Sequence, residues 1–524
     1  MGQSNMINAA TINLSQYRGN GNLNFLGMTN STLYLRGADG VSPVNNINIL
    51  HANSGASYTS TIDLSGGTVD VLANNLLITE RASNGGNYNG SFVLGSGNNV
   101  VNIANVVIAQ GDNFGVTAGT TNNSGSCNGT MTQAGGSVTI QTLTMGVNNQ
   151  SQYTITPINA VYNLFGGFLY AQTITLGAND DLFPNGTVTS TINWTNGTIQ
   201  NYPASDLAIA GININLSNAS VTPTFNVDAG QNINLDVASP INGVGSLAKN
   251  GQGNLILNGT NTYTGNTTIN GGTLEIQQPT FFWRSIVTVA SGAVLKMDFA
   301  GTNQVAALVI NGVSKVPGVY NNSTDPAYLT GTGSLVVVPV STNAYLTSLA
   351  LNPADNLTPS FVTNLFVYYA TNAPGIAPTL TVVNGNLSAS NKLFLNGLAF
   401  QTLTSGVPSL VLTNFGVGST NVLKVLVTAQ DGVTTNLYTV NLTQLPPVLV
   451  NTNTFAITNV VSGSNLNLSW PADHKGWRLQ VQTNSINAGL GNVWYDWPNS
   501  TNLTGVSIPL NPANPSVFLR MVYP

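Results

Sequence analysis

Several segments of this chain repeat one another, and the repeated unit is a glycine corner followed by alternating apolar residues. The three clearest copies are IDLSGGTVDVLANNLLIT (62–79), MTQAGGSVTIQTLTMG (131–146) and YNLFGGFLYAQTITLG (162–177). In each copy a Gly-Gly pair precedes an alternating stretch, a short polar break and a second stretch. Apolar residues at every second position predict short β-strands, so an all-β protein is expected.

The repeat also has a nearly regular period. Looser copies occur at VLGSGNNVVNIANVVIA (93–109) and INWTNGTIQ (192–200). The corner positions taken as equivalent are Gly67, Asn98, Gly136, Gly167 and Gly197. A β-sandwich does not repeat one sequence unit in this way, whereas each coil of a β-solenoid packs on a copy of itself. We therefore predict a solenoid over residues 1–340, with repeats of about 30–38 residues.

Glycine has a physical role at these corners. The chain must turn sharply there, often with a positive φ, and neighbouring coils leave no room for a Cβ atom. The predicted corner residues are Gly66, Gly67, Gly135, Gly136, Gly166, Gly167, Gly271 and Gly272.

The stretch GVGSLAKNGQGNLILNGTNTYTGNTTINGGTLEIQ (243–277) resembles the autotransporter-associated β-strand repeat of bacterial passenger regions. The matching positions are Gly245, Leu247, Lys249, Gly251, Gly253, Leu255, Leu257, Gly259, 261–265, Thr267, Thr268 and 271–274. Residues 305–339 resemble the usual end of such a passenger module. The resemblance implies a right-handed parallel β-helix on a bacterial surface.

The remaining residues differ in character from the repeats. Residues 341–446 resemble the cadherin-like or immunoglobulin-like modules of bacterial surface proteins, and their length and strand spacing suit a β-sandwich. Pro446 and Pro447 indicate a linker. Residues 450–524 resemble a C-terminal module of large secreted proteins from Verrucomicrobia-type bacteria, and we expect a small β-domain there.

The composition excludes several classes of protein. Charged residues make up 6% of the chain, against roughly 25% in an ordinary soluble protein. Disordered chains combine low hydrophobicity with high charge, whereas this chain has few charges and regularly spaced apolar residues, so disorder is not expected. The 12 basic residues are scattered, so nucleic-acid binding is not expected. The single cysteine, Cys127, allows neither an intramolecular disulfide nor a cysteine-based zinc site. No apolar run is long enough to predict a transmembrane helix.

The carboxylates do not form a recognisable catalytic or calcium site. Asp180 and Asp181 are adjacent, but a solvated turn explains such a pair better than a calcium site. Asp63 and Asp70 could approach each other on successive strands of one repeat. Later copies carry other residues at the positions taken as equivalent, namely Thr132, Thr139, Asn163 and Phe168.

The possible nucleophiles and bases are equally isolated. His51 has no nucleophile motif near it, and His474 lies in a turn where a solvated or capping role is expected. Cys127 is interpreted as a small loop or coil residue. We therefore predict no catalytic residue, no metal site and no cofactor, and the chain is not expected to be an enzyme.

The C-terminal region is rich in tryptophan, with Trp470, Trp477, Trp494 and Trp497 close together in the sequence. Small domains need large aromatic residues for their cores, and this is the favoured explanation. The alternative is a sugar-stacking surface formed by Trp477, Trp494 and Trp497.

These features together predict a non-catalytic structural protein of the bacterial exterior, either a filament subunit or an adhesin. Strand edges with few charges to protect them favour self-association into a homopolymer. Other partners considered are a polysaccharide and the cell envelope. The alternative functions are a carbohydrate-binding surface protein and, less favoured, a β-helix polysaccharide lyase or hydrolase.

Overall fold

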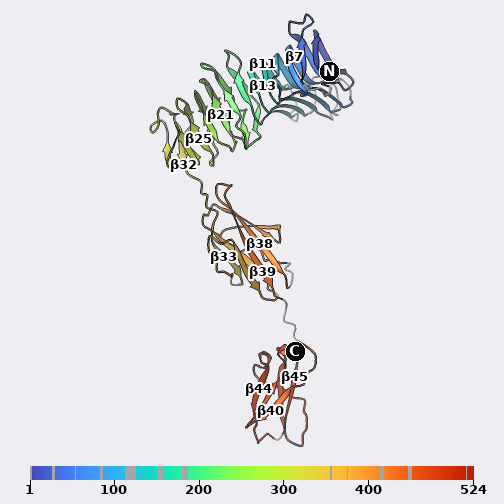
Figure 1. Ribbon diagram of the computed structural model, residues 1–524, viewed down its shortest axis with the longest axis vertical. Coiled ribbons are helices and arrows are strands. Elements are labelled where there is room, and N and C mark those ends of the chain that lie inside the picture. Colours follow the sequence, from blue (N-terminus) through green and yellow to red (C-terminus); the bar gives the residue numbers. More distant parts are fainter. Residues whose placement is uncertain are drawn as a thin grey trace. The chain divides into compact units, whose positions relative to one another are not determined.

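The computed structural model describes residues 3–25, 30–52, 55–82, 86–111, 125–149, 157–179, 187–353, 357–374, 376–413, 418–445, 451–514 and 516–523. These residues form β-strands, loops and two short 3-10 turns, η1 (Ala472–His474) and η2 (Ser500–Asn502). The chain divides into two compact units, Met1–Val340 and Ser341–Pro524 (Figure 1). No helix in the described part of the chain is long and apolar enough to cross a membrane.

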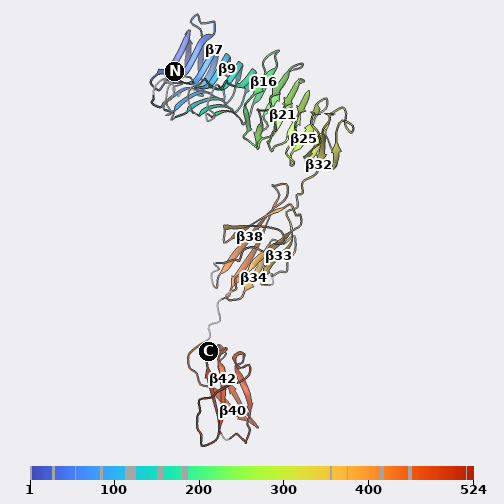
Figure 2. The same ribbon diagram turned by 180° about the vertical axis from the view of Figure 1, so that it is seen from behind.

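The first unit is built from three ladders of parallel strands, which Figures 1 and 2 show from opposite sides. The first ladder contains β1 (Ser4–Asn8), β4 (Ser31–Arg36), β15 (Thr198–Asn201), β18 (Thr224–Asn226), β21 (Leu247–Asn250), β23 (Thr267–Ile269), β25 (Ile286–Val289) and β28 (Ala307–Ile310). The second contains β2 (Thr11–Tyr17), β5 (Val44–Ala52), β16 (Leu207–Ala210), β19 (Asn232–Leu235), β22 (Asn254–Leu257), β24 (Thr273–Ile276), β26 (Val294–Met297) and β31 (Leu329–Gly331).

Four long strands belong to both of these ladders and join them into one 21-stranded sheet: β7 (Gly67–Arg81), β9 (Val100–Gly111), β11 (Ser137–Asn148) and β13 (Phe168–Leu176). The third ladder forms an eight-stranded sheet of its own. Its strands are β3 (Asn22–Asn24), β6 (Tyr58–Leu64), β8 (Tyr88–Leu94), β10 (Cys127–Gln133), β12 (Ile158–Leu164), β14 (Val188–Trp194), β17 (Asn213–Leu216) and β20 (Ile241–Gly243). The chain visits the three ladders in turn and pairs each strand with the next coil, which is consistent with a β-helix.

One hydrophobic core runs through this unit because alternate residues of every strand face inward. In register across successive coils, one inward column reads Leu35, Val71, Val101, Val138, Leu169, Ile199, Phe225, Lys249, Ile269, Val289 and Ile310. Lys249 is the charged member of this otherwise apolar column.

The first coils have the predicted length, but the alignment of the repeats needs two corrections. Equivalent positions in successive coils, read from the strand register, are Asp70, Val100, Ser137, Phe168 and Thr198. Counted back along this register, Gly136 aligns with Asn99 and Val69. The equivalence of Asn98 with Gly136 was therefore wrong by one position, and those of Gly67 with Gly136 and of Asp70 with Thr139 were wrong by two.

Beyond Thr198 the coils become progressively shorter than predicted. The positions in register are Thr198, Thr224, Ala248, Thr268 and Thr288, so each coil uses fewer residues than the long coils before it. The predicted length was wrong here because the third face first carries the shorter strands β17 and β20 in place of the seven-residue strands β6 to β14, and after β20 carries only short connections.

The end of the stack nearest Val340 has a different edge from the interior coils. β29 (Val313–Ser314) pairs antiparallel with β28, and β30 (Gly318–Tyr320) pairs antiparallel with β32 (Ser334–Val337). β32 also pairs in parallel with β27 (Thr302–Val305). Short antiparallel strands thus cover part of the edge that the last coils would otherwise present.

The second unit contains two separate hydrophobic cores. Residues 341–445 form a two-stranded and a five-stranded sheet around the first of them. Their strands are β33 (Leu346–Asn352), β34 (Val367–Asn372), β35 (Thr379–Asn384), β36 (Ser390–Leu395), β37 (Leu398–Leu403), β38 (Thr420–Thr428) and β39 (Thr435–Gln444). The buried Tyr438 links the two sheets, because its hydroxyl accepts from Leu346 N and donates to Thr363 O.

Residues 451–523 form the second core between two three-stranded sheets. One sheet contains β40 (Thr458–Ser462), β41 (Asn465–Ser469) and β44 (Gly505–Pro509), and the other contains β43 (Tyr495–Asp496), β42 (Arg478–Asn484) and β45 (Ser516–Val522). The predicted linker residues Pro446 and Pro447 lie outside the described residues.

Candidate functional sites

The predicted corner glycines are constrained in two different ways. Gly136, Gly167 and Gly272 have positive φ values of 74°, 80° and 60°, and a Cβ on each would lie within 2.4 Å of a main-chain oxygen of the preceding coil. The other five lack a positive φ. For Gly67, Gly135 and Gly166 the obstacle is close contact alone, with a main-chain oxygen at 2.5–2.6 Å from the added Cβ. Gly66 and Gly271 are less crowded, with nearest atoms at 3.3 and 3.0 Å.

Lys249 is a charged residue of the stack whose side chain is fully buried. Its Nζ donates hydrogen bonds to three main-chain carbonyls, those of Asn250 (2.9 Å), Gly251 (2.9 Å) and Gly271 (3.0 Å). These acceptors lie at the turns of two consecutive coils, so the ammonium group ties the coils together. Burial lowers the pKa of Lys249 to about 8.

Side chains replace a strand on the third face of these short coils. Asn261 accepts from Ile241 N (2.8 Å), donates through Nδ2 to Gly259 O (3.0 Å), and its main-chain N–H donates to Oγ1 of Thr280 (3.1 Å). The buried Tyr263 hydroxyl lies 2.6 Å from Oγ1 of Thr267, and burial raises the pKa of Tyr263 to about 12. The NTYTG segment thus turns the chain with all of these polar groups satisfied.

These coils coincide with a known repeat. Residues 247–276 match the passenger-associated-transport-repeat family. The match supports the predicted resemblance over this segment, which covers a small part of the chain. A passenger-associated-transport-repeat implies an extracellular passenger region, secreted to the cell surface or beyond it. No curated protein matches the chain.

Amide ladders run along the outer faces on the N-terminal side of the passenger-associated-transport-repeat. On the third ladder, Asn159 Nδ2 donates to Asn128 Oδ1 (2.7 Å), and Asn128 Nδ2 donates to Asn89 Oδ1 (2.8 Å). A second row on the same face links Asn215 to Asn193 (3.3 Å) and Asn193 to Asn163 (3.0 Å). The outer faces of these coils therefore carry ordered rows of side-chain amides.

The carboxylates considered for catalysis are not brought together. Asp180 and Asp181 lie outside the described residues. Asp63 and Asp70 occur in different sheets: Asp63 accepts from Ser65 N, whereas Asp70 forms an ion pair with Arg36 (2.7 Å). Within the described ranges, no three His, Cys, Asp or Glu side chains are grouped so that they could hold a metal ion.

The isolated histidine and cysteine of the stack have structural partners. His51 Nδ1 forms a very short contact with Oε2 of Glu80, in the adjacent coil. Cys127 is buried, as expected of a residue within a coil of the solenoid, and burial raises its pKa to about 12. A thiol with a raised pKa is a poor nucleophile at neutral pH.

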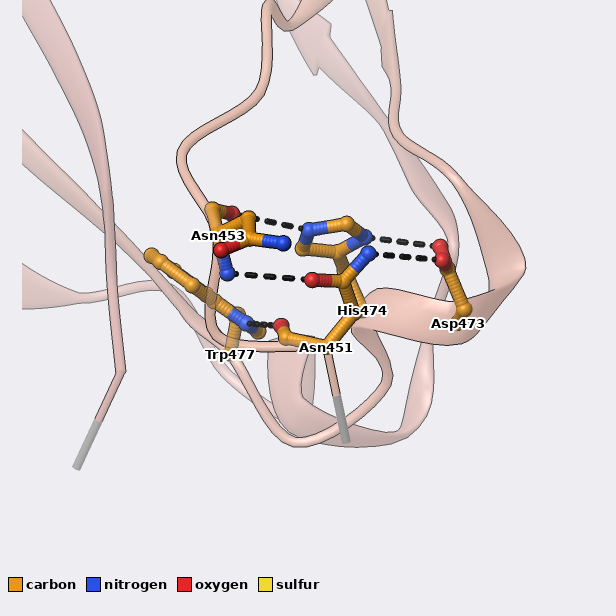
Figure 3. Close-up of polar contacts among 5 residues, drawn as sticks. All are labelled: Asn451, Asn453, Asp473, His474 and Trp477. Atoms are coloured by element: carbon orange, nitrogen blue, oxygen red, sulfur yellow. Dashed lines mark hydrogen bonds and ion pairs between the residues drawn. The ribbon is translucent and has the colours of Figure 1, made fainter. Parts of the chain in front are cut away.

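His474 is buried rather than solvated, which corrects one of the two roles expected of it (Figure 3). Its Nδ1 lies within hydrogen-bond distance of Oδ1 of Asp473 (2.7 Å), and its Nε2 lies within hydrogen-bond distance of the carbonyl oxygen of Asn453 (3.0 Å). Asn451 completes the cluster by donating to Oδ2 of Asp473 and accepting from the Trp477 indole N–H at its carbonyl.

Hydrogen bonds to Asp473, first from Asn451 and then from His474, lower the pKa of that carboxyl group. The ring of His474 also packs against the rings of Phe455 and Trp477, whose centroids lie 4.1 and 5.7 Å from it. The cluster therefore fixes the segment around Asn451 and Asn453 to the turn that carries His474.

The three tryptophans predicted to stack on sugars lie in different environments. Trp477 is 8% exposed and belongs to the cluster around His474. Trp497 packs partly buried against the core of this region. The ring of Trp494 is covered by the guanidinium of Arg520, 4.2 Å from its centroid. This geometry favours a core role for Trp477.

Sequence reasoning missed two of these features. Lys249 was counted among scattered basic residues, although its position two residues after the inward Leu247 places it in the inward phase of the same strand. The cluster around His474 depends on contacts between segments that are not adjacent in the chain, for which the local sequence carries no signal.

Proposed function

We propose that the protein is a non-catalytic extracellular structural protein of a bacterial surface. In this proposal residues 1–340 form a right-handed β-helix, residues 341–446 form an immunoglobulin-like sandwich, and residues 450–524 form a small C-terminal β-domain. Copies associate through β-strand edges, as subunits of a filament or as an adhesin. The passenger-associated-transport-repeat supports the extracellular location.

The observation that carries this proposal is the edge formed by β1, β2 and β3. Among the described residues these strands pair on one side, with β4, β5 and β6. Ile12 and Leu23 are only partly buried, whereas their register partners in the next coil, Ile47 and Ile62, are 0% and 1% exposed. Partly exposed apolar residues along the edge of a sheet favour the addition of a further strand.

The low charge of the chain favours the same conclusion. Natural sheet edges are protected by lysines and inward-pointing charges. The described strands β1, β2 and β3 contain none of Asp, Glu, Lys or Arg. Few charges elsewhere also leave little long-range repulsion between copies.

The test is to measure the mass of the purified protein by light scattering across a dilution series, and to image the same samples by electron microscopy. Association through strand edges predicts a mass that rises with concentration and particles joined at their ends. Monodisperse single particles at every concentration would contradict the proposal.

A carbohydrate-binding function is the second candidate, and it is based on two half-buried tryptophans of the C-terminal region, Trp494 and Trp497. Replacing Trp494 with alanine would abolish retention on polysaccharide gels if this surface bound sugars.

A catalytic function would appear as turnover of neutral or acidic polysaccharides above a heat-inactivated control, and no turnover is expected.

A further inference from the structure

A groove on the outside of the 21-stranded sheet offers a second type of surface, unrelated to strand edges. It has a volume of about 270 Å³, and its ten lining residues include Ala73, Asn102, Ile103, Thr139, Gln141 and Tyr202. The residues from β7, β9 and β11 lie in three consecutive coils, so the groove crosses the strands and runs along the stack.

The groove follows from a change in the alternation of the long strands. In β7 the inward residues are Ala73 and then Leu76, so Asn74 and Asn75 both face outward. β9 and β11 repeat this break at equivalent positions. At each break the strand changes direction, and the buried Ala73 and Ile103 form the floor of the groove.

The walls of the groove carry uncharged hydrogen-bonding groups. Asn102 and Gln141 supply carboxamides, Thr139 supplies a hydroxyl, and Tyr202 supplies an aromatic ring. None of the ten lining residues is charged. The Gln141 amide is oriented by donating to Oε1 of Gln172 (3.3 Å) in the next coil.

A ladder of amides fixes the rim of the groove. Asn105 Nδ2 donates to Asn75 Oδ1 (3.1 Å), and Asn75 Nδ2 donates to Asn46 Oδ1 (3.0 Å). Asn75 donates with both of its N–H bonds, the second to Asn45 O (3.0 Å), whereas each ladder oxygen accepts one such bond and keeps a lone pair for a ligand. Because adjacent strands lie about 4.8 Å apart, these groups recur at that spacing along the groove.

We propose that this groove binds a linear, uncharged polysaccharide lying along the stack. The sugars of an extended chain advance by a step close to the spacing of the coils, and their hydroxyl groups pair well with carboxamides. Tyr202 provides a face for a pyranose ring. The lining offers no cation for an acidic polymer or a nucleic acid, and the main-chain groups of these strands are used within the ladders, so a peptide has no edge to pair with.

This inference is independent of the proposed self-association and is tested on the full chain. Affinity electrophoresis would use gels containing a mixed-linkage β-glucan, glucomannan or xyloglucan, with alginate and polygalacturonate as acidic controls. The neutral polymers are expected to retard the protein and the acidic ones are not. Gln141→Ala and Tyr202→Ala should each weaken binding by about tenfold, which corresponds to about 1.4 kcal/mol.

Asn193→Ala is the matched control, because it removes an outward ladder amide from the other sheet, and it should leave retardation unchanged. Thermal unfolding of each variant verifies that it folds, and Gln141→Asn serves as a milder change at the same place. Retardation by none of the neutral polymers would overturn the proposal. It would also be overturned if acidic polymers were preferred, if the groove variants behaved like Asn193→Ala, or if Trp494→Ala alone abolished binding.

Discussion

At the scale of single residues, the corner glycines could be predicted from the sequence, but the kind of constraint on each could not. A Gly-Gly pair indicates a tight turn, yet whether φ is positive or a neighbouring oxygen is too close depends on the coil beneath. Gly167 combines both constraints, with a φ of 80° and an added Cβ at 2.3 Å from Gly136 O. Gly292 has a similar φ of 76° with nothing within 4 Å of its added Cβ.

Gly167→Ala should therefore destabilise the first unit far more than Gly292→Ala. The positive φ costs about 1–2 kcal/mol in both variants, and overpacking against the adjacent coil adds about 1–3 kcal/mol at position 167 alone. Denaturant unfolding measures both changes. Equal losses for the two variants would show that the coils are not in close contact at this corner.

Lys249 is buried, and its ammonium group donates three hydrogen bonds to main-chain carbonyls. Two of its acceptors, Gly251 O and Gly271 O, would lose this donor in Lys249→Met. The variant should lose about 2–3 kcal/mol of unfolding free energy at pH 7, since unsatisfied buried groups carry such a cost. Lys296→Met is the control, because Lys296 lies in the same unit but is 39% exposed and forms ion pairs with Glu275 and Asp298.

The pH dependence of the same pair distinguishes the two lysines. The pKa of Lys249 is lowered to about 8 in the fold, so above pH 8 the unfolded chain binds more protons and the wild-type protein gains stability as the pH rises. The stability difference between wild type and Lys249→Met should widen between pH 8 and about 9.5. Hydrogen bonds to Asp298 and Glu275 raise the pKa of Lys296. Its stabilising contribution is therefore lost only at a pH above the ordinary lysine pKa, and the stability difference between wild type and Lys296→Met should stay constant between pH 8 and about 9.5. A difference for Lys249→Met that narrowed with pH would contradict the burial of its charge.

At the scale of elements, the alternation of apolar residues predicted the strands of the long coils better than it predicted the path of the chain in the short coils. The copies at 62–79 and 131–146 alternate through both of their stretches, and the structure pairs them in parallel ladders. The third face of the passenger-associated-transport-repeat lacks alternation, because Asn261 and Thr280 satisfy the main chain there instead of a strand partner. Spacing alone could not reveal that the coil shortens there, since the missing strand leaves no pattern of its own.

The amide ladders are elements in their own right, and each link requires both a donor and an acceptor. Asn193→Asp would remove the Nδ2 donor to Asn163 and place a carboxylate against that residue's oxygen. A loss of about 0.5–1.5 kcal/mol is expected at pH 7. Asn218→Asp should be nearly neutral in the same unfolding assay, because Asn218 only accepts, from Ser220 N. Equal effects at the two sites would mean that the ladder contributes no stability.

At the scale of the whole molecule, the two ends of the first unit differ in how their edges are covered. Antiparallel β29 and β30 lie against β28 and β32 at one end, which was not expected from the sequence. At the other end, β1, β2 and β3 form the edge among the described residues. Short antiparallel strands protect an edge from growth, so we expect association to involve the β1–β3 edge rather than both ends.

Ile12→Lys tests this expectation at its most sensitive position. The side chain of Ile12 lies in the inward column above Ile47, where it is only partly buried, and a lysine there would point a charge at the surface that a second copy must cover. Inward-pointing charges block edge pairing, so the variant should remain a monomer at concentrations where the wild-type mass rises.

Val237→Lys is the matched control, because it adds the same charge to the same unit at a residue that is 76% exposed and far along the chain from the edge strands. Light scattering on a dilution series of all three proteins gives the answer, with thermal unfolding to confirm that Ile12→Lys still folds. If both lysine variants associate as the wild type does, the contact between copies lies elsewhere. If both become monomers, net charge rather than the β1–β3 edge controls assembly. The edge is responsible only if Ile12→Lys alone abolishes the concentration dependence.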